Sequence, residues 1–306
     1  MDLVMTRAAA PGGLRGVLGA TGGMTLVGTL AAISATIGRY PVFSGQALRY
    51  ALAAAILLPL AARQRSRAAG PLGVRDLFLL LALTATGLAG FNYCLVEAAR
   101  HADPATVATV VGGAPVVMAF AGPLVAGHRP SLRVLLGALL VAGGAGLANG
   151  VGGGSAEGFA YAAGALAGEL LFSLLALPLL PKLGPVRLSA YCTALAVPML
   201  AALAVIAGES PRVPTAGEGA AIVYAGVVIT VVAFLLWYDA LGRLGPDRAS
   251  LFAGVIPISA AVTTMVLGLG VPSGATLAGC LLVAAGVTYG TTLGGGQDYR
   301  KKDDDA

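Results

Sequence analysis

Ten apolar runs in the sequence are each long enough to cross a lipid bilayer, which takes about 17–25 residues of helix. Only 11% of the residues are charged, whereas soluble domains carry about 25%, so a water-facing surface could not be covered. The runs are too long for strands and lack sustained alternation. They predict an all-α polytopic membrane protein whose ten transmembrane helices cover residues 16–37, 43–62, 76–98, 104–126, 132–149, 158–180, 186–207, 218–241, 247–269 and 274–293.

Most of the 19 Lys and Arg residues fall in alternate loops between these runs. Short loops with excess Lys and Arg face the cytoplasm. We therefore expect cytoplasmic tails at 1–15 and 294–306 and a location in the inner (plasma) membrane. The net charge of +5 is spread over these loops, which argues against nucleic acid as a partner. The basic residues on the cytoplasmic side are Arg7, Arg15, Arg63, Arg65, Arg67, Arg75, Arg129, Arg133, Lys182, Arg187, Arg243, Arg248, Arg300, Lys301 and Lys302.

An internal repeat relates the two halves of the chain. A shift of 142 residues places Glu97–Gly144 on Asp239–Gly286 without a gap, and the matched pairs include Pro104 with Pro246, Gly112 with Gly254, and Pro115 with Pro257. Since each copy holds five helices, an odd number, the second enters the membrane from the opposite side. The sequence thus predicts two inverted five-helix halves, 16–149 and 158–293, an arrangement typical of secondary transporters.

Three features carry a resemblance to a known family: Ala47-Leu-Arg-Tyr50, the two proline-containing helices, and the similar runs Gly137–Gly144 and Gly279–Gly286. With them the chain resembles the drug/metabolite transporter superfamily, in its ten-helix EamA-type branch. Within this branch it is similar to YddG-type exporters of aromatic amino acids. The resemblance implies a small-molecule substrate. The chain departs from the family where a Gly-Glu-Arg/Lys turn is usual, because it reads Gly127-His128-Arg129.

Paired prolines near the middle of two helices are the first candidate elements of a substrate path. Each proline removes an N–H and so frees the carbonyl four residues earlier. Such carbonyls are tolerated at membrane depth where they are buried in protein or line a watery cavity. We expect two matched kinks along the path, although ordinary kinks are the alternative. The residues concerned are Val111, Gly112 and Pro115 in one half and Ala253, Gly254 and Pro257 in the other.

Glu169 is the one acidic residue in the middle of a predicted span. Ionisable residues at this depth usually face a cavity or a partner. One interpretation is a site for a substrate ammonium or a coupling proton. The other is an internal ion pair with Arg49, which lies in the outer half of its helix. The two interpretations are compatible.

Further polar and aromatic residues at membrane depth complete the predicted path. Asn92 and Tyr93 are polar groups within the third run, and Trp237 and Tyr238 stand near the inner end of the eighth. For Trp237 an interfacial aromatic belt is the favoured alternative. Glu97 with Arg100, and Asp239 with Arg243, have the spacing of local ion pairs.

The leading functional hypothesis is a permease that exports amino acids or related small amphiphilic metabolites by alternating access. Export of drugs or lipophilic cations is the second, and a scaffold or channel subunit without a transport cycle is a third. A membrane enzyme is disfavoured, because no enzyme signature or cluster of His, Asp or Cys occurs. Cys94, Cys192 and Cys280 lie in apolar runs without metal-ligand spacing, so neither a metal nor a cofactor is expected. Membrane lipid is the other expected partner, and the sequence predicts no oligomeric state.

Overall fold

The computed structural model describes residues 11–30, 40–64, 72–125, 127, 129–150 and 152–291. Within these ranges every regular element is a helix, and one isolated β-bridge joins Ala102 to Gly154. The predicted tail 294–306, residues 1–10 of the other tail and the end of the predicted helix 16–37 lie outside the described residues. The described helix Pro11–Gly28 includes the last residues of the predicted tail 1–15. Proline suits the first turn of a helix, where no N–H is needed.

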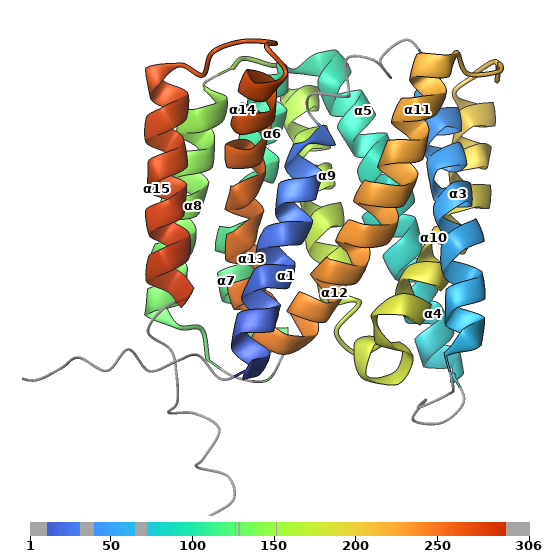
Figure 1. Ribbon diagram of the computed structural model, residues 1–306, viewed down its shortest axis with the longest axis horizontal. Helices are drawn as coiled ribbons and strands as arrows, with labels where there is room; N and C mark the ends of the chain where they lie inside the picture. The colour runs from blue at the N-terminus through green and yellow to red at the C-terminus, as the bar shows by residue number, and fades with distance from the viewer. Residues whose placement is uncertain are drawn as a thin grey trace, which may run out of the picture.

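The helices, in chain order, are α1 (Pro11–Gly28), α3 (Val42–Arg63), α4 (Val74–Thr84), η1 (Ala85–Gly90), α5 (Phe91–His101), α6 (Pro104–Val111), α7 (Ala114–Val125), α8 (Leu132–Asn149), α9 (Ala156–Leu174), α10 (Leu180–Ile206), α11 (Ala216–Tyr224), η2 (Ala225–Val232), α12 (Ala233–Leu244), α13 (Pro246–Leu251), η3 (Phe252–Gly254), α14 (Val255–Val266) and α15 (Gly274–Thr291). They stand side by side in one bundle (Figure 1). We call the end that holds the start of α1 the lower end, and the end that holds residues 207–215 and 267–273 the upper end, as in Figure 1.

Eight helical stretches in the described part of the chain are long and apolar enough to cross a membrane. Helices α1 and α9 are not among them, although both stand in the same bundle (Figure 1). The glycines of α1 and the two glutamates of α9 lower the hydropathy of these helices. The eight stretches are Val42–Arg63, Val74–His101, Pro104–Val125, Leu132–Asn149, Leu180–Ile206, Ala216–Leu244, Pro246–Val266 and Gly274–Thr291.

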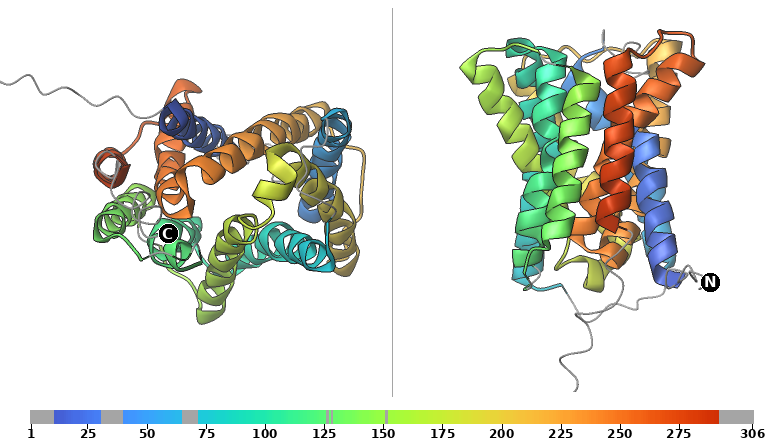
Figure 2. Two further views of the ribbon diagram at one scale, coloured as in Figure 1. Left: turned by 90° about the horizontal axis from the view of Figure 1, so that it is seen from below. Right: turned by 90° about the vertical axis from the view of Figure 1, so that its left-hand side faces the viewer.

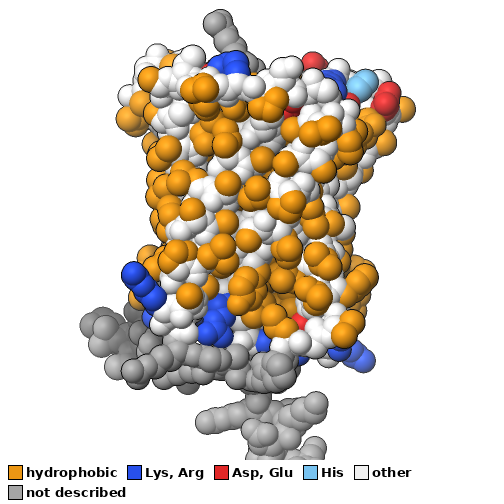
Figure 3. Space-filling view, turned by 90° about the vertical axis from the view of Figure 1, so that its right-hand side faces the viewer, with side chains coloured by type: hydrophobic (Ala, Val, Ile, Leu, Met, Phe, Trp, Pro, Cys, Tyr) orange, Lys and Arg blue, Asp and Glu red, His pale blue; other side chains and the backbone are white. Residues whose placement is uncertain are grey.

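The outer surface of the bundle is apolar over most of its height. Large hydrophobic side chains such as Phe120, Leu139, Val262 and Leu281 are exposed, and Lys and Arg side chains gather near the two ends (Figure 3). Soluble proteins rarely expose so continuous an apolar surface. This surface and the length of the apolar helices indicate a multi-pass membrane protein.

Four of the helical stretches long enough to cross a membrane are irregular near their middles. A π-helical segment, η1, separates α4 from α5, and another, η2, separates α11 from α12. A turn at Gly112 and Gly113 separates α6 from α7, and the 3₁₀ segment η3 separates α13 from α14. The 142-residue shift carries 85–90 onto 227–232, within η2, and Gly112 onto Gly254, the last residue of η3. Since π segments occur frequently at functional sites, these irregular segments direct attention to the middle of the bundle.

Glycines allow the closest helix contacts. Helices α8 and α15 stand together at one edge of the bundle (Figures 1 and 2). A Cβ atom on Gly144 would lie 2.7 Å from the carbonyl oxygen of Gly279, and one on Gly286 would lie 2.7 Å from that of Gly137. Such small residues let the backbones of membrane helices touch. The pair therefore forms a rigid wall against which the middle of α13 and α14 packs.

Candidate substrate-binding site

One face of α9 places three side chains in a row along the bundle axis. Tyr161, Glu169 and Phe172 are separated by eight and three residues, so they point to the same side of the helix. The exposed positions of α9 nearest the lipid, such as Ala163 and Ala167, lie on the opposite side. Glu169 therefore faces the interior of the bundle, about 12 Å along the axis from Tyr161 and about 4.5 Å from Phe172 at 1.5 Å per residue.

The carboxylate of Glu169 has no hydrogen-bond or ion-pair partner among the residues that the structure describes. The residue is half-buried, so its side chain remains within reach of small molecules. Its helix can approach α4 and η1 closely because Gly168, its neighbour, lies against the carbonyl of Thr86. An unpaired carboxylate inside a membrane bundle is costly, and such residues usually mark a pathway or a ligand site.

An upper aromatic group surrounds Tyr161. The ring of Tyr161 lies 6.1 Å from that of Tyr93 and 6.1 Å from that of His101, and the Tyr93 ring stacks on Phe43 at 6.3 Å. Tyr93 and Tyr161 keep some exposure, whereas Phe43 is buried. The predicted pathway residue Tyr93 thus belongs to an aromatic wall above Glu169.

A lower aromatic group surrounds Phe172. Its ring lies 5.1 Å from Phe234 and 5.1 Å from Tyr238, and Phe234 also lies 6.5 Å from Tyr50. Tyr238 is fully buried, and its hydroxyl has no hydrogen-bond partner within the described residues. Gly87 of η1 fixes the position of Phe172, because a Cβ there would lie 2.7 Å from the Cβ of Phe172. These rings pack together on the lower side of Glu169.

Arg49 is bound to η2 rather than to Glu169. Its Nε donates to Thr230 Oγ1 at 2.6 Å and its Nη1 donates to Gln46 Oε1 at 3.3 Å. No ion pair joins Arg49 to Glu169 in the part of the chain that the structure describes, so that interpretation is wrong. The irregular backbone of η2 offers the reason, because it brings the Thr230 hydroxyl against α3 at the depth of Arg49. Nothing in the sequence points to this partner.

The two interruptions lie beside the predicted kinks, and Gly254 packs against neighbouring helices. A Cβ on Gly254 would lie 2.6 Å from side-chain atoms of Val141 and of Val283, in α8 and α15. Pro115 is buried and Pro257 half-buried. Gly112 lies near Ala145 of α8 in the same way. The glycines of both interruptions thus pack on the wall formed by α8 and α15.

The carbonyls freed by the two prolines remain half-buried. Val111 packs with the hydrophobic cluster that contains Val107 and Ala162. Ala253 lies within η3, where the N–H of Val255 bonds the carbonyls of Phe252 and Ala253. The carbonyl of Ala253 is therefore not free as the sequence predicted, because the backbone tightens into a 3₁₀ turn.

Two further predicted pathway residues are used for structure. Asn92 is buried, and its Nδ2 donates to the carbonyl of Leu88 in η1 at 2.7 Å. Trp237 is 8% exposed within the main core. The interfacial-belt interpretation of Trp237 is wrong, because α1 covers this part of α12 through Gly23. Both local ion pairs are confirmed, with Arg100–Glu97 at 2.8 Å and Arg243–Asp239 at 2.7 Å.

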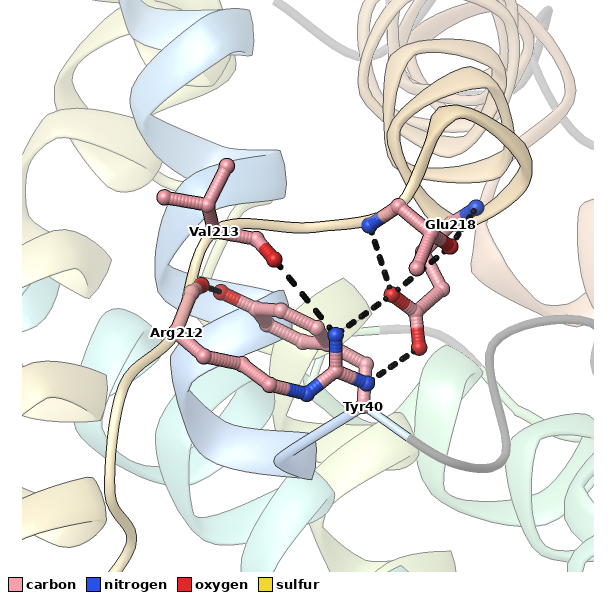
Figure 4. Close-up of polar contacts among 5 residues, drawn as sticks. Tyr40, Arg212, Val213 and Glu218 are labelled. Atoms are coloured by element: carbon pink, nitrogen blue, oxygen red, sulfur yellow. Dashed lines mark hydrogen bonds and ion pairs between the residues drawn. The ribbon is translucent and has the colours of Figure 1, made fainter.

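At the upper end, residues 209–218 tie α3 to α11. Arg212 donates to both oxygens of Glu218, one of them at 2.8 Å, and its guanidinium lies over the ring of Tyr40 (Figure 4). The Tyr40 hydroxyl donates to the Arg212 carbonyl at 2.8 Å. Glu209 accepts the backbone N–H groups of Phe43 and Ser44 at 2.9 and 2.8 Å, which caps α3. Sequence reasoning missed Glu209, since its partners are more than 160 residues away.

At the lower end, an ion pair ties α4 to α10. Lys182 Nζ lies 2.8 Å from both carboxylate oxygens of Asp76, which is buried. Asp76 also accepts the N–H of Gly73 at 2.9 Å. A hollow of about 410 Å³ opens beside the pair. Within the described ranges, no group of three or more His, Cys, Asp or Glu residues could hold a metal ion.

Comparisons with known proteins agree with this geometry. The model of the EamA-like transporter family matches residues 14–150 and again residues 159–291. The Uncharacterized transporter YetK of Bacillus subtilis (strain 168) is 25% identical over 254 residues, which cover 80% of this chain and 77% of that protein. A solved structure described as a crystal structure of protein superposes with a TM-score of 0.76 at 21% identity. The match covers 93% of this chain and 98% of that one, and it supports the fold alone.

Proposed function

Because the chain belongs to the EamA-like transporter family, and is thus a membrane transporter, we propose that it exports amino acids or related small amphiphilic metabolites. The observation that carries this proposal is the carboxylate of Glu169, which lies between two aromatic groups and has no partner among the described residues. A carboxylate can bind a substrate ammonium, and aromatic rings on either side suit an apolar side chain. A small amphiphilic amine-containing metabolite meets both requirements.

We infer that the transporter consists of two inverted halves of five helices each, ten spans in all. Three observations support this arrangement: the family model matches the chain twice, the irregular segments recur at a spacing of 142 residues, and the helix contacts are symmetric. If each helix is replaced by its counterpart in the other half, α1 becomes α9 and α12 becomes α5, so the contact of α1 with α12 becomes that of α9 with α5. The same replacement leaves the pairs α3 with α10 and α8 with α15 unchanged. The substrate site of such transporters lies at the interface of the repeats, near the middle of the membrane.

The transport cycle proposed is alternating access across the inner membrane, with both termini in the cytoplasm. The basic loops then place the lower end on the cytoplasmic side. In this orientation the lower aromatic group closes the route from Glu169 to the cytoplasm, while half-exposed residues of the upper aromatic group stand on the other side. Release and binding on the two sides require the aromatic groups to open in turn.

Export of a lipophilic cation is the second candidate, because a carboxylate among aromatic rings also suits a cation without a carboxylate. Arg49 disfavours it, because no described residue neutralises its charge and a positive charge near the path would repel such a substrate.

Counterflow in proteoliposomes tests the proposed function. Vesicles that hold the purified protein are loaded with one unlabelled compound, and uptake of the labelled compound from outside is followed. We expect counterflow with phenylalanine or another apolar amino acid and none with tetraphenylphosphonium. Counterflow with tetraphenylphosphonium alone would establish the second candidate and reject the first.

A further inference from the structure

Arg49 presents one bound edge and one free edge. Its Nε is held by Thr230 at 2.6 Å. On the other side, Nη1 makes one long contact of 3.3 Å to Gln46, and Nη2 has no partner among the described residues. The Nη1–Nη2 edge of a guanidinium is one of the two edges that bind a carboxylate through two parallel hydrogen bonds. Apart from the long contact with Gln46, that edge of Arg49 has no partner in the part of the chain that the structure describes.

The bound edge is fixed by the irregular backbone of η2. The Thr230 hydroxyl accepts from Arg49 and donates its own proton to the carbonyl of Ala225, five residues earlier, at 3.0 Å. Thr230 is fully buried, so water cannot compete for the hydroxyl. Gly226 permits this contact, because α3 passes so close that a Cβ on Gly226 would lie 3.1 Å from the carbonyl oxygen of Arg49. The π segment therefore sets the direction of the guanidinium.

The bundle thus holds two opposite charges at membrane depth that do not neutralise each other. Glu169 has no partner and Arg49 has only neutral partners among the residues that the structure describes. Uncompensated charges in a membrane are expensive, and each needs a partner of opposite sign. A ligand that carries a carboxylate would give Arg49 a partner of opposite sign, and one that also carries an ammonium would give Glu169 its own.

We propose that the free Nη1–Nη2 edge of Arg49 binds the carboxylate of the substrate and that Thr230 is the positioning residue that aims it. The inference rests on the proposed function and narrows its substrate class to zwitterionic α-amino acids with an apolar or aromatic side chain. Amines, amides and esters of the same side chain lack the carboxylate and are poor substrates. On binding, the carboxylate replaces the long contact of Arg49 with Gln46.

The first test uses the unaltered protein and three probes that share one side chain. Counterflow of labelled phenylalanine is competed with unlabelled phenylalanine, phenylalaninamide and phenethylamine. Loss of two charge-assisted hydrogen bonds should weaken competition by the amide and the amine at least about tenfold. Equal competition by the three compounds would overturn the inference and leave the proposed function standing. If another apolar amino acid gives counterflow where phenylalanine does not, the same comparison is made with that amino acid, its amide and its decarboxylated amine; absence of counterflow with every apolar amino acid would reject the proposed function, and the inference with it.

The second test separates positioning from folding. Thr230→Val keeps the volume of the side chain and removes the hydroxyl, whereas Thr230→Ser keeps the hydroxyl. We expect Thr230→Val to raise the half-saturating concentration of phenylalanine about tenfold without changing competition by phenethylamine. Thr230→Ser should restore most of the affinity for phenylalanine. The matched control is Thr193→Val, at a fully buried threonine of α10 whose hydroxyl also bonds backbone carbonyls, and it should leave both compounds unchanged.

Either of two results of the second test would overturn the inference. Equal weakening of phenylalanine and phenethylamine by Thr230→Val would mean that the residue acts on the whole site. Unchanged affinity for phenylalanine in that variant would mean that Arg49 does not read the carboxylate. If Thr230→Val does not fold, the comparison of the three probes on the unaltered protein still decides.

Discussion

Asp76 and Glu218 are each the third residue of a helix, lie 142 positions apart, and form ion pairs at opposite ends of the bundle. Each carboxylate also accepts a backbone N–H three residues earlier, from Gly73 at 2.9 Å and from Thr215 at 2.8 Å. The partner of Asp76 is Lys182 at the start of α10, and that of Glu218 is Arg212. One acid–base tie therefore stands at each end of the molecule.

The lower tie should contribute measurably to stability. Asp76 is buried but Lys182 is about a third exposed, so the loss on breaking the pair lies between that of surface and buried ion pairs. We expect Asp76→Asn and Lys182→Met each to lower the free energy of unfolding by about 1–2 kcal/mol. Because both variants remove the same interaction, the double variant should lose less than the sum. Thermal unfolding in detergent measures this, and strictly additive losses would contradict the prediction.

Glu169→Gln should reduce transport without preventing folding. The amide keeps the size of the side chain but removes the negative charge that binds the substrate ammonium. We expect the half-saturating concentration to rise at least about tenfold. If Glu169 also carries a coupling proton, the variant loses any dependence of transport on pH between about 5 and 8. The control is Glu157→Gln, at the exposed end of the same helix, and equal transport by both variants would remove Glu169 from the site.

The sequence predicted the helical class and many boundaries because these depend on local signals. Residues 132–149 were predicted and observed as a helix, since Pro130 and Ser131 precede it and Gly150, with φ 84°, ends it. Apolar length alone could not reveal η1 and η2, because their residues are those of ordinary membrane helices. The 142-residue spacing that relates η1 to η2 is seen only in the structure.

The sequence pointed to Glu169 and Arg49, but one of the two interpretations that it allowed, an ion pair between them, is wrong. Depth along a helix can be estimated at 1.5 Å per residue, but the direction of a side chain around the bundle depends on how the helices pack. Contacts such as Arg49 with Thr230 and Glu209 with Ser44 span more than 160 residues. The same lack of rotational information explains why Trp237 and Gly254 were assigned to the membrane interface and to the path.

Replacement of either matched proline by alanine should slow the transport cycle. Alanine restores an N–H, which can bond the carbonyl of Val111 in one helix and compete for that of Ala253, bonded within η3, in the other. The added backbone hydrogen bond stiffens the helix beside its interruption. For Pro115→Ala and Pro257→Ala we therefore expect a several-fold fall in the maximal counterflow rate with unfolding temperature kept or raised. Pro198→Ala, at an exposed proline inside α10, is the control. Normal rates in both matched variants would show that these helices do not bend during transport.

The reactivity of introduced cysteines gives a second test of whether these two helices line the path. Single cysteines at Val111 and Ala253, in a background without Cys94, Cys192 and Cys280, should react with polar thiol reagents. A transported substrate should slow the reaction if the carbonyls line its path. Cysteines that stay unreactive in an active transporter would place both positions in packed protein or lipid.

The proposed topology predicts that residue 154 and the C-terminus lie on opposite sides of the membrane. Gly154 is exposed in the loop between α8 and α9, at the upper end. An epitope tag inserted there should be accessible from outside intact cells, whereas a tag at residue 306 should be accessible only after the membrane is opened. If both tags are accessible from outside, the inverted arrangement of the halves is wrong.

Substrate protection of Glu169 in the unaltered protein is the most direct test of the account. Dicyclohexylcarbodiimide, which reacts with carboxyl groups in apolar surroundings, is added to proteoliposomes, and the modified residue is located by mass spectrometry. The account predicts modification at Glu169 and a slower reaction when a transported amino acid saturates the protein, with weaker protection by phenethylamine at the same concentration. Modification of Glu169 at the same rate with and without a saturating transported substrate would contradict it.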